Sequence, residues 1–230
     1  MTQNSTTTAP APPAEARTQA RIAGLAYMMT IVAGMFAEAY VRGSIRSIDP
    51  VQTAERLSEF QQLHRFGILA DGVMLISYIV VTALLYRLFK PVSATVALLA
   101  AFFSLIGIAV LAASLTILVL PLQLAGASIA GDALRAHSAA YSLTGLFFGP
   151  YCGAIGWLAI RSRWLPASIG WLMCLAGAAF VFDAVIDLVA PVTAQMVPAA
   201  VMLISLIAEG SLAIWLASVG VRQQTRAAQA

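Results

Sequence analysis

The sequence predicts an all-α fold, namely a polytopic membrane helical bundle with six transmembrane helices. Hydrophobic residues make up 60% of the 230 positions, charged residues only 10%, and the mean hydropathy is +0.87. A soluble domain carries about 25% charged residues, so this composition indicates that much of the surface faces lipid. Apolar stretches of about 20 residues, the length at which a helix crosses a bilayer, recur along the whole chain.

Six apolar stretches are predicted to cross the membrane as helices. They cover about residues 22–42, 66–88, 95–121, 138–160, 167–190 and 198–220. The connections between them are short, so we expect one membrane domain over residues 21–221 and no second folded domain. Residues 1–20 are rich in Thr, Pro and Ala and have too little apolar surface to pack, which predicts a disordered tail. Residues 222–230 are expected to form a second tail.

The distribution of basic residues predicts that both tails are cytoplasmic. With the N-terminus inside, eight basic residues flank the spans on the inner side and five on the outer side. An excess of Lys and Arg marks the cytoplasmic connections of membrane proteins. Topology and contact with membrane lipids therefore account for the net charge of +3. No basic stripe with interleaved aromatic residues points to nucleic acid as a partner.

The connection between the first two predicted spans contains an amphipathic segment near residues 51–63. Asp49 and Pro50 precede it, and these residue types favour the cap and the first turn of a helix. Leu57 and Phe60 recur at helical spacing, whereas charged residues occupy the other face. We expect a short helix on the outer surface that acts either as a lid or as an interfacial anchor.

The fourth predicted span carries glycines at four-residue spacing, Gly145, Gly149 and Gly153. Such a face of small residues lets another helix approach closely, either within the chain or in a homo-oligomer. Pro150 follows Gly149 and removes one backbone hydrogen bond, so a kink is expected beside it.

Five of the ten acidic residues lie inside the predicted spans: Glu38, Asp71, Asp183, Asp187 and Glu209. A carboxylate in a membrane-spanning helix costs several kcal/mol unless it is paired or meets water, so such groups mark the interior of a bundle. In the expected orientation the first four lie toward the outer ends of their spans, and Glu209 lies near the midplane. The pattern predicts a polar core that is open to the outer side.

Some of these acids have candidate partners nearby in the sequence. Arg42 lies one helical turn beyond Glu38, the spacing of an ion pair on one helix face. Arg65 is expected to meet Asp71 or another acid across the outer opening of the bundle. Asp183 and Asp187 lie one turn apart, where two carboxylates repel each other unless a cation or a proton lies between them. Glu209 has no arginine near it in the sequence.

Three classes of function remain open from these residues. The acids can be structural ion pairs that fix helix register in a structural or interaction protein, or they can bind a small ligand or cation. They can also serve a proton- or cation-coupled transporter of small solutes, with Glu209 as the deep site. The candidate ligand- or ion-binding residues are Glu38, Asp71, Asp183, Asp187, Glu209, Arg42, Arg65 and Tyr151.

One further class, an intramembrane metal-dependent hydrolase, is the least favoured. His64 and His137 are both expected at the outer side, where they could join Asp71 or Asp183 around zinc. The sequence nevertheless contains no His-Glu-x-x-His motif and no nucleophile elbow. We therefore expect no catalytic residue, no resident metal and no cofactor.

Several stretches also carry a family resemblance. The chain contains, in this order, RIAGLAYMMTIVAGMFAEAYVRG, HRFGILADGVMLISYIVVTALLYRLFKPVSATVALLAAFF, GAIGWLAIRSRWLPASIGWLMCLAGAAFVFDA and AEGSLAIWL. Over about residues 20–220 they resemble the bacterial membrane-protein family called domain of unknown function 4386. The resemblance implies a six-helix protein of the bacterial cytoplasmic (inner) membrane with no established activity. It also implies that typically polar family positions are matched by Glu38, Arg42, Arg65, Asp71, Arg87, Asp183 and Glu209.

Where family members often carry His in the fourth span, this chain has Tyr151. That departure leaves only His64 and His137 as metal-ligating histidines, which weakens the metal hypothesis further.

Overall fold

A computed structural model describes residues 15–124, 127–190 and 198–221, and within these ranges the chain is helical with no strands. The predicted all-α fold is therefore confirmed. The elements in chain order are α1 (Ala16–Met35), the π-helix η1 (Phe36–Arg42), α2 (Gly43–Ile45), α3 (Pro50–Glu59), α4 (Gln61–Phe89), α5 (Ala94–Gln123), α6 (Ala127–Leu143), α7 (Gly145–Ser162), α8 (Ala167–Val189) and α9 (Pro198–Ser218).

Six helices in the described residues are long and apolar enough to cross a membrane, as the sequence predicted. They run over Ala16–Ile45, Gln61–Phe89, Ala94–Gln123, Ile129–Ser162, Ala167–Val189 and Ala200–Ser218. The first, second and fourth are longer than the predicted stretches because polar turns extend them at one or both ends. A helix of 30 residues such as α5 measures about 45 Å, which exceeds the roughly 30 Å of a bilayer core.

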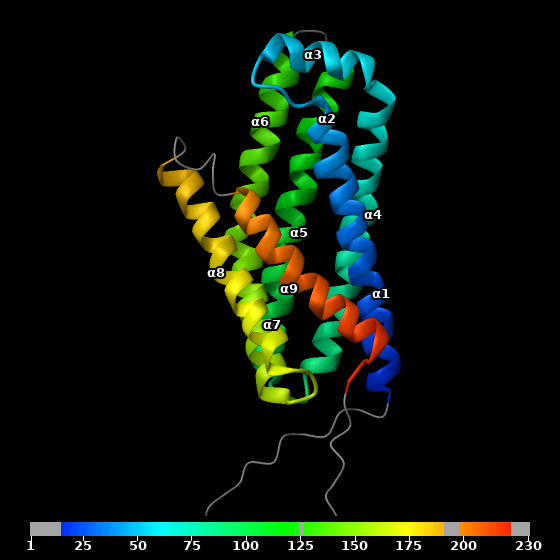
Figure 1. Ribbon diagram of the computed structural model, residues 1–230, viewed down its shortest axis with the longest axis vertical. Helices are drawn as coiled ribbons and strands as arrows, with labels where there is room; N and C mark the ends of the chain where they lie inside the picture. Colours follow the sequence, from blue (N-terminus) through cyan, green and yellow to red (C-terminus); the bar gives the residue numbers. More distant parts are fainter. Residues whose placement is uncertain (1–14, 125–126, 191–197, 222–230) are drawn as a thin grey trace, which may run out of the picture.

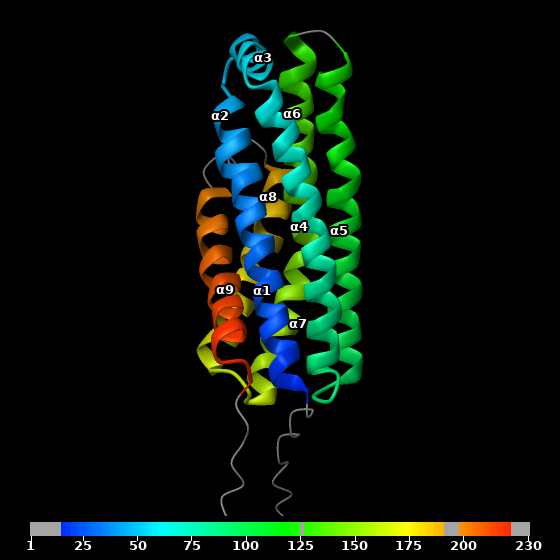
Figure 2. The same ribbon diagram turned by 90° about the vertical axis from the view of Figure 1, so that its right-hand side faces the viewer.

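The helices form an elongated bundle, and the upper and lower parts of this bundle contain different sets of helices (Figures 1 and 2). α4, α5 and the α6–α7 pair run its full height, whereas α8 and α9 are tilted and cover only the lower part. The start of α1 and the end of α9 lie together at the lower end, and α3 lies across the upper end. The upper part therefore consists of the α1–η1–α2 helix, α4, α5 and α6.

α3 confirms the predicted helix between the first two spans, although it ends at Glu59 and α4 starts at Gln61. The Asp49 side chain caps it by accepting a hydrogen bond of 2.9 Å from the Val51 amide. Leu57 is buried in a small apolar cluster with Ile45 and Leu134. Phe60, the other apolar residue predicted on this face, is exposed. The lid and the interfacial anchor therefore both stay predictions.

The predicted close approach at the glycines of the fourth span occurs within the chain, between α7 and α8. Gly145 and Gly149 both lie against α8, and a Cβ built on Gly149 would come within 2.7 Å of the Gly177 carbonyl oxygen. A Cβ on Gly153 would meet no atom within 4 Å. Homo-oligomerisation through this face stays a prediction, and Gly153 is the glycine of the three that keeps open space for it.

The interruption of the fourth span lies at Thr144, between α6 and α7, whereas Pro150 lies inside α7. Proline disturbs the turn that precedes it, because its ring collides with the carbonyl four residues earlier. The helix is therefore interrupted at Thr144, on the N-terminal side of Pro150, and not at the proline itself.

The α7–α8 contact yields a stability prediction. Gly149→Ala should lower the free energy of unfolding by about 1–3 kcal/mol, because the added methyl group overlaps the backbone of α8. Thermal and denaturant unfolding in detergent micelles measure this change. Gly153→Ala on the same helix is the matched control and should raise stability by up to about 1 kcal/mol through helix propensity alone. Equal effects of the two substitutions would contradict the packing argument.

Candidate functional site

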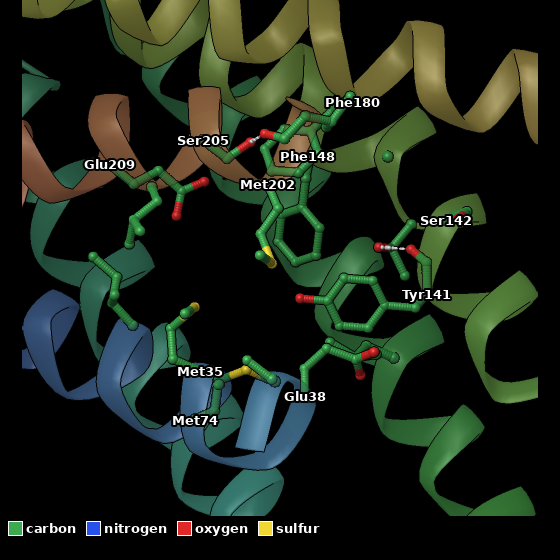
Figure 3. Close-up of a pocket in the computed structure, with 18 of the residues that line it drawn as sticks. Met35, Glu38, Met74, Tyr141, Ser142, Phe148, Phe180, Met202, Ser205 and Glu209 are labelled. Carbon is green, nitrogen blue, oxygen red and sulfur yellow. Dashed lines mark hydrogen bonds between the residues drawn. The ribbon is translucent and has the colours of Figure 1, made fainter. Parts of the chain in front are cut away.

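A cavity of about 540 Å³ lies between α1 on one side and α6, α7 and α8 on the other. α1 packs against α4 and α9, but in the described residues its backbone makes no close approach to α6, α7 or α8. All six membrane-crossing helices contribute to the cavity wall, and α9 covers one side of it (Figure 3). The cavity therefore occupies the space that the two halves of the bundle leave between them.

Three of the five acids identified in the sequence line this cavity: Glu38 from η1, Asp183 from α8 and Glu209 from α9. The Glu209 carboxylate points into the cavity, whereas that of Glu38 points away from its centre (Figure 3). Asp71 and Asp187 do not line it. The structure thus brings three of the predicted residues to one space and leaves two outside it.

The Arg42 guanidinium holds two of the acids at once. Its Nε donates to Glu38 Oε2 at 2.5 Å, and its Nη1 and Nη2 donate to the two carboxylate oxygens of Asp71 at 2.6 and 3.0 Å. Arg46 adds a second cation, with Nη2 at 3.0 Å from Glu38 Oε1 and 3.0 Å from Ser138 Oγ. This cluster of two arginines and two carboxylates, the Arg42 cluster, is balanced in charge.

The predicted ion pair between Glu38 and Arg42 is therefore present, and the predicted partner of Asp71 was wrong. Arg65 is exposed, and none of the ion pairs within the described residues includes it. Arg65 precedes Asp71 by six positions, which places it about 120° away around the helix. Arg42, which is 29 positions away in the sequence, faces Asp71 from η1 instead.

Glu38 and Arg42 both belong to the π-helix η1. A π-helical turn is rare in proteins and occurs frequently at functional sites. Its residues Phe36–Arg42 contain neither Gly nor Pro, so no local signal in the sequence indicated it.

His64 and His137 are buried and serve as contacts between helices. His64 Nε2 lies 2.9 Å from the Leu118 carbonyl oxygen, and His137 Nδ1 lies 3.1 Å from Ser114 Oγ. Within the described residues, no group of three or more His, Cys, Asp or Glu side chains is placed to hold a metal ion. The two histidines therefore connect α4 to α5 and α5 to α6.

Glu209 is surrounded by hydroxyl and thiol groups and has no cationic partner among the described ion pairs. The Cys152 thiol lies 3.8 Å from Glu209 Oε1, and the Tyr27 hydroxyl also lies near the carboxylate. The rings of Tyr27 and Tyr151 flank Tyr78, with centroid distances of 5.7 and 5.9 Å. Only Tyr151 was a candidate from the sequence, because Tyr27, Tyr78 and Cys152 lie in separate apolar stretches with no motif to connect them.

Two of these hydroxyl groups are buried without a hydrogen bond of good geometry in the described part of the chain, those of Tyr27 and Tyr151. Unpartnered buried polar atoms are rare in proteins, and each calls for a physical explanation such as a ligand, an ion or a water molecule.

Asp183 and Asp187 differ in their surroundings although they lie one turn apart on α8. Asp183 is buried and, like Ser142, lines the cavity. Asp187 is half-buried and lies outside the cavity wall. Neither takes part in an ion pair within the described residues. The cavity therefore carries two carboxylates, Asp183 and Glu209, that no arginine or lysine balances.

The Arg42 cluster yields a second stability prediction. Asp71→Asn should lower the free energy of unfolding by about 3–5 kcal/mol, because it removes one partner of a buried ion pair and leaves the guanidinium undercompensated. The matched control is Asp132→Asn, which removes the exposed pair with Arg135 and should change stability by less than about 1 kcal/mol. Unfolding in detergent micelles compares the two variants. A change as small in Asp71→Asn as in the control would show that the buried pair does not stabilise the bundle.

Comparison with known families identifies the chain. Searches among curated proteins and among solved structures gave no match. The model of one family, described as domain of unknown function (DUF4386), matches residues 22–220, which is most of the chain and includes all the residues of the cavity wall. The chain therefore belongs to the DUF4386 family of proteins with membrane-spanning helices.

Proposed function

We propose that this protein binds a small organic cation in the cavity between α1 and the α6–α8 side of the bundle. The observation that carries the proposal is the pair of uncompensated carboxylates, Asp183 and Glu209, on the wall of one cavity. A carboxylate buried in a membrane protein without a counter-charge costs several kcal/mol, and a bound cation removes that cost.

The balance of charge in the bundle supports a cationic ligand. The Arg42 cluster contains as many arginines as carboxylates, so the Glu38 end of the cavity is neutral. Arg46 is the cation on the cavity wall and is already shared between Glu38 and Ser138. The negative charge that remains for a ligand therefore lies at Asp183 and Glu209.

The size and lining of the cavity support an organic ligand over a bare metal ion. A volume of about 540 Å³ lies within the range of roughly 300–1,000 Å³ that is typical of small-molecule sites. The sulfur atoms of Met35, Met74 and Met202 face the cavity, and Phe148 and Phe180 complete an apolar wall (Figure 3). Thioether and aromatic groups pack against hydrocarbon, and aromatic faces also attract organic cations.

Transport of such a cation is the second candidate function. It is favoured by the depth of the cavity, which extends from Glu38 on η1 to Glu209 in the middle of α9. We place the protein in the bacterial inner membrane with both termini in the cytoplasm, on the distribution of basic residues. In that orientation Glu38 lies toward the outer side, and the ligand enters from there.

Binding by variants tests the proposal. The protein is placed in nanodiscs of zwitterionic lipid, and isothermal titration calorimetry measures the affinity for 4-phenylbutylammonium, with empty nanodiscs correcting for partition into lipid. Glu209→Gln and Asp183→Asn should each weaken binding about tenfold or more, because each removes a charge-assisted contact. Asp132→Asn neutralises an exposed carboxylate outside the cavity and should bind like the wild type.

Two results would overturn the proposal: affinity unchanged in both cavity variants, or no tighter binding of the ammonium than of neutral 4-phenylbutanol. Either result would favour a structural or interaction role for the acids. Uptake of radiolabelled 4-phenylbutylammonium into proteoliposomes tests the transport candidate separately. Binding without uptake above that of protein-free liposomes would exclude transport of this probe.

A further inference from the structure

We infer that the cationic group of the ligand is an ammonium that carries N–H donors, and that it binds at the Glu209 end of the cavity. The class of ligand is thus a protonated primary or secondary amine with an apolar body. This inference rests on the proposed function and adds to it the chemistry of the head group and its position.

The first argument comes from the hydroxyl groups of the cavity wall. A Ser or Thr hydroxyl has one proton to donate and two lone pairs that accept. Thr30 donates its proton to the Ala26 carbonyl at 3.1 Å, and Ser205 donates its proton to the Val201 carbonyl at 2.8 Å. Both hydroxyls are therefore left with lone pairs only. At this end of the cavity they can accept hydrogen bonds from a ligand but cannot donate.

The second argument comes from Glu209 and its neighbours. Glu209 lies one helical turn beyond Ser205 on α9, and both line the cavity side by side (Figure 3). The Cys152 contact, at 3.8 Å, is a long hydrogen bond from a weak donor and leaves most of the acceptor capacity of the carboxylate unused. The Tyr27 hydroxyl lies near the carboxylate but makes no hydrogen bond of good geometry in the described residues. Glu209 is therefore a strong acceptor on the cavity wall that is largely unfilled.

The third argument comes from the two buried hydroxyls without partners. Tyr27 lies one turn before Thr30 on α1 with its hydroxyl near Glu209, and Tyr151 lies against Tyr78, which lines the cavity. Such hydroxyls are costly when nothing satisfies them, and a polar group bound at Glu209 supplies the missing partner. An ammonium suits the Glu209 end of the cavity because its N–H groups donate hydrogen bonds to the Glu209 carboxylate and to the oxygens of the hydroxyl groups around it.

The same acceptor-rich end selects against other head groups. An anion would meet the Glu209 carboxylate and two hydroxyls that have no proton to offer. A quaternary ammonium has charge but no N–H, so the lone pairs of Thr30 and Ser205 would stay unfilled. The hydrocarbon part of the ligand then extends from Glu209 along Met35, Met74 and Met202 (Figure 3).

The experiment compares three ligands that share one hydrocarbon body. In the same nanodiscs, the affinity is measured for 4-phenylbutylammonium, for N,N,N-trimethyl-4-phenylbutylammonium and for 4-phenylbutanol. The wild type should bind the primary ammonium about tenfold or more tightly than the trimethyl ligand, because only the primary ammonium donates hydrogen bonds. Thr30→Val and Ser205→Ala should each reduce this ratio by about threefold or more, with little change in the affinity for the trimethyl ligand.

Two matched controls have the same local chemistry outside the cavity. Thr116 is exposed and donates to the Ala113 carbonyl, and Ser218 on α9 is exposed and donates to the Ile214 carbonyl. Thr116→Val and Ser218→Ala should leave the ratio unchanged. Wild-type protein alone gives the ratio, so the test stands even if a cavity variant fails to fold.

The outcomes separate the two proposals. Equal affinity for the primary and trimethyl ammonium ligands, with both weakened by Glu209→Gln, would overturn the inference about N–H donors and leave the proposed function intact. Failure of both cations to bind more tightly than 4-phenylbutanol would overturn the proposed function itself. A tenfold preference that neither Thr30→Val nor Ser205→Ala reduces would contradict the assigned position of the head group.

Discussion

The Arg42 guanidinium is the constraint on which the upper half of the bundle depends. An arginine side chain keeps its charge under all physiological conditions, so burying it requires carboxylates at fixed positions around it. Glu38 on its own helix and Asp71 on α4 supply them, and the paired contact with both oxygens of Asp71 fixes how η1 and α4 face each other. Because Glu38 is turned toward Arg42 and Arg46, it leaves the centre of the cavity to the other acids.

Tight packing elsewhere explains why a cavity exists at all. Glycines bring the backbones of α7 and α8 together, and Gly24 does the same for α1 against Ala213 and Ala217 of α9. These contacts divide the lower bundle into one group with α1, α4 and α9 and another with α7 and α8. α9 touches both groups, but in the described residues α1 has no close backbone contact with α7 or α8. Tyr78 of α4 stacks on Phe148 of α7 at a centroid distance of 5.0 Å, and the space that remains beside this contact is the cavity.

The sequence was sufficient for features that depend on neighbours within one helix. Long apolar stretches predicted the six spans, the four-residue spacing predicted the pair of Glu38 with Arg42, and the glycine spacing predicted a close helix contact. It was insufficient where partners come from different helices. Whether Asp71 meets Arg65 or Arg42 depends on the rotation of η1 against α4, which no pattern along one helix reveals. The tyrosines around Glu209 lie on α1, α4 and α7, and their grouping likewise required the fold.

The acids therefore fall into two groups: Glu38 and Asp71 pair with arginines, whereas Asp183 and Glu209 form no ion pair in the described residues. Arg42 lies on η1 and Arg46 directly follows α2, and among the described residues no ion pair includes Asp183 or Glu209. The charges are balanced at the Glu38 end of the cavity, whereas the carboxyl groups toward Glu209 have no ion pair in the described residues. A ligand with one charged group and an apolar body gains most when the charge lies at Glu209 and the body lies against the methionines. Asp183, which lies on α8 across the cavity from α1, adds to the same field, so one orientation of the ligand is favoured over its reverse.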